Sequence, residues 1–249
     1  MIRLDIVIPV YNEGRGIVAV LESLRRCVKT PFRVLVCYDR DDDDTLPALR
    51  LPSPDILLVK NQGRGPHGAV VSGFRASTAP AVLVFPADDT QNAGMIDTMV
   101  EKLDQGCEIV AASRLMPGGR MVGCPWLKNF LVRVSAFTLH HLARVPTHDP
   151  SNGFRLFSRR VLESIPIEST EGFTYSIELL VKCHRLGRKI GEVPVSWLER
   201  TSGTSRFRVV RWLPAYLRWY GYAFATTLLH RPARTVKMSS SVCGVGVVR

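Results

Sequence analysis

The 249-residue sequence lacks the features that would carry it through or across a membrane. No run of about 18 residues is free of charged side chains, as a transmembrane helix would require. The N-terminus, Met-Ile-Arg-Leu-Asp-Ile-Val-Ile-Pro-Val, has Asp5 within its apolar run and no signal-peptide cleavage site. We therefore predict no spanning helix and no secretory leader, and we interpret this run as a first strand.

Metal-thiolate and disulfide chemistry are also poorly supported. The six cysteines are scattered, with no C-x-x-C spacing and no accompanying histidine pattern. Reduced thiols in a cytosolic protein are the expected state. The glycine-rich segment Asn61–Ala69 lacks the G-K-[ST] ending of a P-loop, which excludes that phosphate-binding motif.

Positive charge is concentrated in the second half of the chain. Residues 1–120 hold 14 Lys/Arg and 15 Asp/Glu, whereas residues 121–249 hold 19 and 7. This asymmetry suggests an anionic partner such as phosphates, an acidic membrane face or nucleic acid, with a merely soluble basic surface as the alternative. No known nucleic-acid-binding motif accompanies the charge, so we expect no nucleic-acid partner.

Strand and helix patterns alternate along the chain. Strands are predicted at Leu4–Pro9, Phe32–Tyr38, Asp55–Lys60, Ala81–Phe85, Glu108–Ala112, Phe154–Phe157 and Ile190–Trp197, and helices at Gly16–Arg26, Pro66–Ser77, Met95–Gln105, Pro125–Arg144 and Tyr175–Leu186. The β-α-β rhythm of the first half predicts an α/β fold with a mostly parallel sheet flanked by helices. We expect one domain over residues 1–230 and a flexible tail over 231–249.

The stretch Ala81–Asp89, Ala-Val-Leu-Val-Phe-Pro-Ala-Asp-Asp, carries the strongest functional signal. A strand this apolar is expected to be buried on both faces, as in a parallel sheet covered by helices. Asp88 and Asp89 then lie at the carboxyl end of the sheet, where open α/β folds bind ligands. Two acids held there repel each other unless a cation lies between them. The pair predicts a metal that carries a phosphorylated ligand.

Three further motifs have a functional and a purely structural interpretation. Pro9–Gly14 follows the first strand and can present polar groups to a nucleotide, although any such turn favours Asn and Gly. Asp39 follows the second strand and can accept hydrogen bonds from a base or ribose, whereas Asp41–Asp44 is expected to be mostly a solvated acidic loop. The glycines of Asn61–Ala69 permit close approach of backbone to a ligand.

The basic C-terminal part offers two more features. Arg200 and Arg206 flank a Gly/Ser-containing segment that predicts a lid closing on a diphosphate, with a disordered basic loop as the alternative. Arg206–His230 is predicted to be an amphipathic helical segment interrupted at Pro214. Its arginines interleave with Trp212, Tyr216, Trp219 and Tyr220, a pattern typical of a helix at a bilayer interface. Alternatively, these aromatic side chains pack against the sheet.

The order of these motifs over residues 3–225 resembles glycosyltransferase family 2, most closely the dolichol-phosphate or polyprenyl-phosphate sugar synthase branch. The motifs are Asp-Ile-Val-Ile-Pro-Val-Tyr-Asn-Glu, Tyr-Asp-x-Asp, Asn-x-Gly-x-Gly, Pro-Ala-Asp-Asp, Gly-Phe-Arg and Arg-x-x-Gly-x-Ser-Arg. The resemblance implies a GT-A fold, related to the Rossmann fold, an inverting transferase, a nucleotide-sugar donor (GDP- or UDP-sugar) and Mg²⁺ or Mn²⁺. Residues 1–120 would form the donor-binding half and 121–230 the acceptor-binding, membrane-facing half.

The resemblance also implies roles for individual residues. Its catalytic group comprises Asp88, Asp89, Arg200 and Arg206. The metal ligand would be Asp88, with Asp89 or the side-chain oxygens of Thr90 and Gln91 completing the shell. Donor-binding positions are Pro9, Tyr11, Glu13, Asp39, Asn61, Gly65 and Ala87. Acceptor-side positions are Asp149, Ser151, Gly153, Arg155 and Glu178.

The chain departs from the family pattern at Pro86, where the first acid of the D-x-D element is expected. The resemblance implies sugar transfer to a polyprenyl or dolichyl phosphate by a peripheral enzyme at the cytoplasmic face of a membrane. A phosphate acceptor is already ionised, whereas a hydroxyl acceptor would need a base, for which Asp149 or Glu178 are candidates. The alternatives are a family 2 transferase that uses such a hydroxyl, or a nucleotide-sugar-binding protein with little or no metal-dependent activity.

Overall fold

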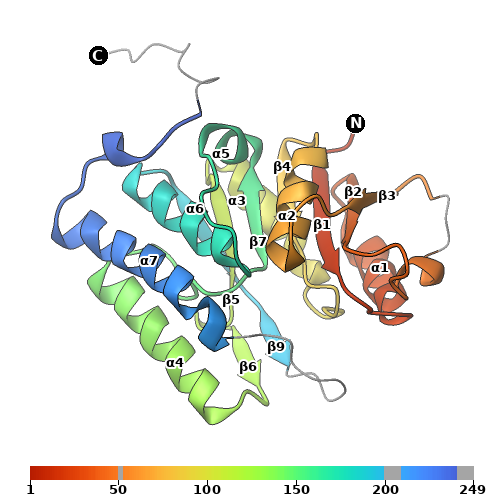
Figure 1. The fold of residues 1–249 in the computed structure, drawn as a ribbon, viewed down its shortest axis with the longest axis horizontal. Coiled ribbons are helices and arrows are strands. Elements are labelled where there is room, and N and C mark those ends of the chain that lie inside the picture. Colours follow the sequence, from red (N-terminus) through yellow and green to blue (C-terminus); the bar gives the residue numbers. More distant parts are fainter. Residues whose placement is uncertain (50–52, 199–208, 240–249) are drawn as a thin grey trace.

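A seven-stranded sheet organises the computed structural model, which describes residues 1–49, 53–198 and 209–239 (Figure 1). Its strands are β1 Leu4–Val10, β2 Phe32–Tyr38, β3 Ile56–Lys60, β4 Ala81–Val84, β5 Ile109–Ser113, β7 Arg155–Ser158 and β8 Ile190–Pro194. They are ordered β3-β2-β1-β4-β7-β5-β8. A second, two-stranded sheet pairs β6 Arg120–Val122 with β9 Ser196–Leu198.

All neighbouring pairs in the large sheet are parallel except those made by β7, which runs antiparallel to both β4 and β5. The predicted α/β fold with a mostly parallel sheet is therefore confirmed. The reversal has a functional consequence. Because β7 is antiparallel, its start at Arg155 lies beside Val84, at the end of β4. The loop before β7 thus reaches the same sheet edge as the carboxyl ends of the parallel strands.

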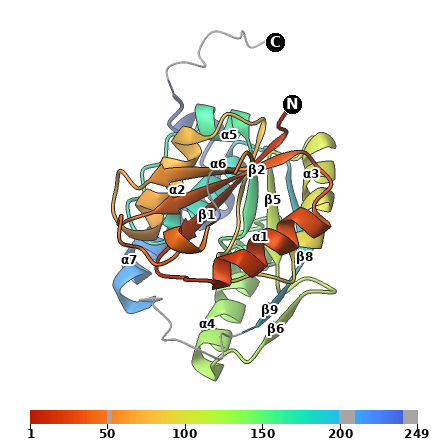
Figure 2. The same ribbon diagram turned by 90° about the vertical axis from the view of Figure 1, so that its right-hand side faces the viewer.

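Helices cover both faces of the sheet (Figure 2). The described helices are α1 Gly16–Cys27, α2 Gly65–Ala76, α3 Ile96–Asp104, α4 Trp126–Phe137, α5 Arg159–Ser164, α6 Thr174–Arg185 and α7 Val209–Leu228, with a π-helical turn at Thr138–Leu142 and 3-10 turns at Leu46–Ala48, Ala93–Met95 and Ala233–Thr235. One core cluster joins α1 and α3 to one face, and a second joins α2 and α6 to the other. A third packs α7 on α6.

Gly73 shows why α2 lies so close to the sheet. A Cβ atom at this position would come within 2.5 Å of Val7 Cγ1 and 2.8 Å of Cys37 Sγ. Both neighbours are fully buried strand residues, in β1 and β2. Glycine is therefore needed here for close packing between helix and sheet.

The second half differs from the prediction in several places. The predicted strand Ile190–Trp197 is divided at Val195 between β8 and β9, and the short elements β6 and α5 were not predicted. The predicted interruption at Pro214 is wrong, because α7 continues through this residue. Pro214 lies in the second turn of α7 and removes one backbone hydrogen bond, and the residues that pack α7 on α6 follow it, from Tyr216 onward.

The predicted flexible tail also begins with packed residues. Val236 is buried, and the Ser239 N–H donates to the Ser164 carbonyl at 2.9 Å. The remainder of that tail, residues 240–249, lies outside the described residues. A membrane-crossing helix, which would have to be both long and strongly apolar, is not found in the described part of the chain.

Candidate functional site

The carboxyl ends of β1, β2 and β3 bring three predicted donor-binding residues to neighbouring positions. Val10 pairs with Tyr38, which in turn pairs with Lys60. Tyr11, Asp39 and Asn61 each follow one of these paired residues directly. They therefore emerge side by side at one edge of the sheet, the edge at which open α/β folds bind ligands. Pro9 is the residue before Val10, within β1 itself.

Asp39, Asn61 and Gly65 form one hydrogen-bonded unit at this edge. The Asn61 amide donates to Asp39 Oδ1 at 2.5 Å and to the Gly65 carbonyl at 3.1 Å, and it accepts from the Gly63 N–H at 2.7 Å. A Cβ on Gly63 would come within 2.8 Å of Gly68 Cα. These glycines therefore serve the packing of the β3–α2 turn, and Asn61 fixes its shape.

The turn after β1 is held by the acidic loop, which is mostly exposed, as expected, except at Asp43. The backbone N–H groups of Asn12, Glu13 and Gly14 donate to Asp43 Oδ2, Thr45 Oγ1 and Asp44 Oδ1 at 3.0, 3.0 and 2.8 Å. Asp43 is buried, whereas Asp41 and Asp42 are exposed as expected. Since these N–H groups are already bonded, a ligand would meet the side chains of this turn, among them the exposed Tyr11 and the partly exposed Glu13.

Asp88 and Asp89 differ in their surroundings, although they are adjacent. Asp88 is exposed beyond the end of β4, after the buried Ala87. Asp89 Oδ1 accepts from the N–H groups of Gln91 and Asn92, both at 2.9 Å, and its Oδ2 accepts from the Asn92 amide at 2.7 Å. Asp89 thus closes the loop that presents Asp88. Gln91 itself is exposed.

Asn92 links this loop to the second sheet. Its amide nitrogen donates to the Ser196 carbonyl at 2.7 Å, and its amide oxygen accepts from the Ser196 N–H at 2.9 Å. Sequence reasoning missed Asn92, although its position three residues after a carboxylate is typical of a capping partner. Arg200 and Arg206, which follow β9 in the chain, lie outside the described residues.

Asp149, which was predicted for the acceptor side, is buried in an ion pair with Arg114. Arg114 Nε and Nη2 donate to the two Asp149 oxygens at 2.6 and 2.9 Å, and Ser151 Oγ donates to Oδ1 at 3.0 Å. Burial alone would raise the pKa of Asp149, but the charge and hydrogen bonds of Arg114 outweigh it and lower the pKa. Arg114 follows β5 directly; only the structure reveals its pairing with Asp149.

Arg155, also predicted for the acceptor side, hydrogen-bonds to the loop that precedes β7. It is completely buried, and its guanidinium donates to the carbonyls of Ser176 and Pro150 at 2.5 and 3.3 Å. Burial lowers its pKa to about 10. Phe154 packs edge-on against Phe85, with ring centroids 4.9 Å apart, which joins this loop to the one after β4. Gly153, the residue directly before Phe154, is only partly exposed.

Glu178 is likewise buried and fully engaged. It forms an ion pair with Lys182 at 2.6 Å and accepts from the N–H groups of Glu168 and Ser169 at 2.7 and 2.8 Å. These contacts fix the loop before α6. The structure therefore gives Glu178 a structural role away from solvent.

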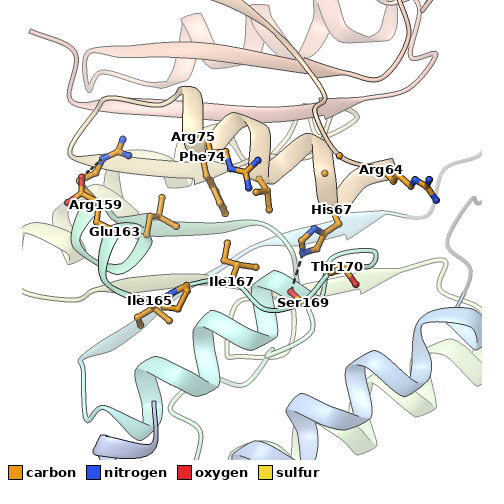
Figure 3. Close-up of a pocket in the computed structure, with 15 residues that line it drawn as sticks. Arg64, His67, Phe74, Arg75, Arg159, Glu163, Ile165, Ile167, Ser169 and Thr170 are labelled. Atoms are coloured by element: carbon orange, nitrogen blue, oxygen red, sulfur yellow. Dashed lines mark hydrogen bonds and ion pairs between the residues drawn. The ribbon is translucent and has the colours of Figure 1, made fainter. Parts of the chain in front are cut away.

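A groove of about 810 Å³ lies between α2 and residues 159–170 (Figure 3). Val71, Phe74 and Ile167 contribute apolar lining, and the buried His67 donates to or accepts from Ser169 at 3.1 Å. Burial lowers the pKa of His67. None of the predicted site residues lines this groove, so the candidate active site remains the open edge of the sheet around Asp39, Asp88 and Asp149.

Comparisons with known proteins agree with this architecture. Residues 5–165 match the family model described as Glycosyl transferase family 2. An uncharacterized glycosyltransferase of Mycobacterium tuberculosis is 29% identical over 201 residues, which cover 81% of this chain and 88% of that protein. The polyprenol monophosphomannose synthase of Mycolicibacterium smegmatis is 26% identical over 230 residues, with coverage of 84% and 86%.

Among solved structures, glucosyl-3-phosphoglycerate synthase from M. tuberculosis in complex with UDP superposes with a TM-score of 0.64 at 19% identity, covering 90% of this chain and 79% of that one. The same enzyme with Mn²⁺, UDP and phosphoglyceric acid gives 0.63 at 19% identity, with coverage of 92% and 78%. At this level of identity the likeness establishes the fold.

Proposed function

The chain belongs to glycosyltransferase family 2 and is a glycosyltransferase, and from this premise we propose that it transfers a sugar from a nucleotide-sugar donor to a polyprenyl phosphate. The proposed setting is the surface of a membrane, since the acceptor's apolar chain resides in the bilayer. The face that we propose is the cytoplasmic one. The similarity to polyprenol monophosphomannose synthase over most of both chains supports this acceptor class.

The main support for a phosphate acceptor is that both candidate general bases, Asp149 and Glu178, are already bound in ion pairs within the protein. A hydroxyl nucleophile needs a group that removes its proton, and such a group must be within hydrogen-bonding reach of the substrate. Asp149 is bound by Arg114, and Glu178 is bound by Lys182 and two backbone N–H groups. A phosphate oxygen is already ionised at neutral pH and attacks without such help.

We assign donor binding to the sheet edge formed by β1, β2 and β3. Tyr11 is 43% exposed and provides a ring for a nucleobase, while Asp39, oriented by Asn61, provides an acceptor for base or ribose N–H and O–H groups. The adjoining Glu13 and Gly65 complete the rim of this proposed nucleotide site.

The residues present fit a divalent cation shared between protein and donor. Asp88 supplies an exposed carboxylate at the strand end, whereas Pro86 supplies no ligand and Asp89 is largely occupied by Asn92 and Gln91. Mg²⁺ is commonly held by one or two carboxylates together with substrate phosphates and water. Structures with this fold contain Mn²⁺ or Mg²⁺ with UDP. Bound in this way, the ion would offset negative charge on the diphosphate.

The proposed reaction is an in-line displacement with inversion. The acceptor phosphate oxygen forms a bond to the anomeric carbon as the bond from that carbon to the diphosphate oxygen breaks, releasing a nucleoside diphosphate. The chain's main contribution is electrostatic, because negative charge accumulates on the leaving group. We assign this role to Asp88, which would hold the cation, and to Arg200 and Arg206, whose guanidinium groups suit phosphate oxygens.

A water-soluble phosphorylated hydroxyl acceptor is the second candidate, favoured by the fold shared with glucosyl-3-phosphoglycerate synthase in complex with phosphoglyceric acid. Purified protein with Mn²⁺ should be offered UDP- and GDP-sugars together with either a short-chain polyprenyl phosphate or 3-phosphoglycerate. We expect product only with the polyprenyl phosphate. Transfer to 3-phosphoglycerate alone would reject the proposed acceptor class.

A further inference from the structure

Helix α4 exposes an apolar face that the rest of the described chain leaves uncovered. Trp126 is 79% exposed, and the other members of the face are between 43% and 59% exposed: Leu127, Phe130, Leu131, Val134 and Phe137. Isolated exposed leucines are ordinary, but a contiguous set of large apolar residues marks an interaction surface. We call these six residues the α4 face.

The spacing of these residues places them on one side of the helix. At 3.6 residues per turn, positions 126, 127, 130, 131, 134 and 137 form a single stripe. Ala136, on the opposite side, is buried, as is Leu139 in the π-helical turn that follows. The helix is therefore attached to the body through its other side, and the α4 face points away from the core.

Helix α7 extends this surface. It lies beside α4 at the same end of the molecule (Figure 1), and Thr138, just after α4, hydrogen-bonds to Tyr220 of α7. Leu213, Leu217 and Leu228 of α7 are exposed. By contrast Trp219, which the sequence suggested for a bilayer interface, is buried against α6 beneath Lys182. The aromatic residue holds α7 in place, and leucines form its outer surface.

Helices α4 and α7 themselves carry only positive charge, and Arg218 of α7 pairs with Glu168 at 2.9 Å. No Asp or Glu occurs between Glu108 and Asp149, or after Glu199. Arg120, Arg133 and Arg144, close to the α4 face in sequence, are exposed. A second copy of the chain would bring cations against cations, because a two-fold interface matches each surface with itself. A bilayer with anionic headgroups instead attracts a cationic rim and accepts apolar side chains.

We propose that the α4 face, continued by the exposed leucines of α7, docks on the surface of an anionic lipid bilayer. In this arrangement the apolar side chains enter the boundary between headgroups and acyl chains, and the surrounding arginines contact lipid phosphates. The inference rests on the membrane setting of the proposed function and names the surface that makes the contact, and its test does not depend on which acceptor is used.

Flotation of the full-length protein with lipid vesicles tests the proposal. We expect the protein to bind vesicles of phosphatidylcholine with phosphatidylglycerol, and to bind pure phosphatidylcholine and high-salt samples less well. The double variant Phe130→Ser with Leu131→Ser should reduce binding at least about tenfold, since each side chain contributes apolar burial. Leu57→Ser, at an exposed apolar position on the edge strand β3, is the matched control and should bind as the wild type does.

Tryptophan fluorescence gives a second measurement. Because Trp126 is strongly exposed, vesicles should shift its emission to shorter wavelength, and Trp126→Phe should remove that shift. Equal flotation of wild type and double variant, or a wild-type dimer in sedimentation that the double variant abolishes without vesicle binding, would overturn the proposal. Transfer to a short-chain, water-soluble acceptor should be unchanged in the double variant, so failure of the docking inference is distinguishable from failure of the proposed reaction.

Discussion

Asn92 holds the carboxylate of Asp89 at 2.7 Å, and the same amide group bridges to both backbone polar groups of Ser196. The loop that carries Asp88 is therefore fixed from two sides, by its own turn and by β9. Since β9 leads in sequence toward Arg200, one buried amide joins two parts of the proposed diphosphate site. We infer that Asn92 is a positioning residue for this site.

Replacement of Asn92 by alanine should loosen the loop without removing a proposed ligand. Outer-shell partners of metal ligands typically contribute about 10–100-fold in metal affinity or activity. We expect Asn92→Ala to raise the Mn²⁺ concentration needed for half-maximal transfer by a factor in this range. Gln105→Ala, at an exposed amide after α3, is the control. An unchanged Mn²⁺ dependence in Asn92→Ala would contradict the positioning role.

The two adjacent acids should respond differently to substitution. Asp88→Asn should lower the transfer rate by about 100-fold or more, as expected for loss of electrostatic stabilisation at the reacting centre, and should leave the melting temperature nearly unchanged because Asp88 is exposed. Asp89→Ala should reduce the free energy of unfolding by about 0.5–2 kcal/mol, the usual effect of losing a capping side chain. Thermal melts and initial rates on both variants would reveal the contrast; equal behaviour would reject the division of roles.

The sequence predicted the first half of the fold well because its signals are local. Apolar runs such as Phe32–Tyr38 bounded by polar turns define β2 without reference to distant residues. The second half depends on long-range partners. β6 has three residues and exists by pairing with β9, and the reversal of β7 follows from its position between β4 and β5. No local pattern reports either relationship.

The candidate site likewise contains residues that local sequence signals predicted and residues whose surroundings depend on distant parts of the chain. Asp39, Asn61 and Asp88 were predicted because strand ends are visible in sequence, and the structure brings the first two into contact. Asp43 was expected to be solvated, since four consecutive aspartates favour solvent. Asp43 instead accepts from the N–H of Asn12, which becomes a neighbour only in the folded chain, and from the nearby N–H of Thr45. Arg114, the partner of Asp149, was missed for the same reason, whereas Lys182 lies only four residues after Glu178 in α6, a helical pair that the sequence could have revealed.

Gly73 offers a test of packing between α2 and the sheet. In Gly73→Ala the new methyl group would overlap Val7 and Cys37, which are fully buried and cannot move freely. We expect a loss of about 1–3 kcal/mol in the free energy of unfolding, the usual cost of overpacking. Gly16→Ala is the matched control at the start of α1, where a Cβ meets nothing within 4 Å, and it should be neutral or stabilise by up to about 1 kcal/mol. Similar urea midpoints for both variants would contradict the close-approach argument.

The Arg114–Asp149 pair predicts a defined dependence of stability on pH. The pKa of Asp149 in the folded protein lies below the ordinary value of 3.8, so the folded state binds this proton less tightly than the unfolded state does. The stabilising contribution is therefore complete above about pH 3.8 and is lost as pH falls through the lowered pKa. At neutral pH, Asp149→Asn leaves Arg114, whose side chain is only 11% exposed, without its counter-ion and should cost about 3–5 kcal/mol.

The pH dependence separates this explanation from a general packing defect. Because the asparagine side chain cannot ionise, the stability difference between wild type and Asp149→Asn should be largest at neutral pH and shrink below about pH 3.8. Asp104→Asn, which breaks an exposed pair with Arg3, should cost no more than about 1 kcal/mol. Urea unfolding at a series of pH values measures both variants. A pH-independent difference for Asp149→Asn would mean that lost packing, and not the ion pair, accounts for its effect.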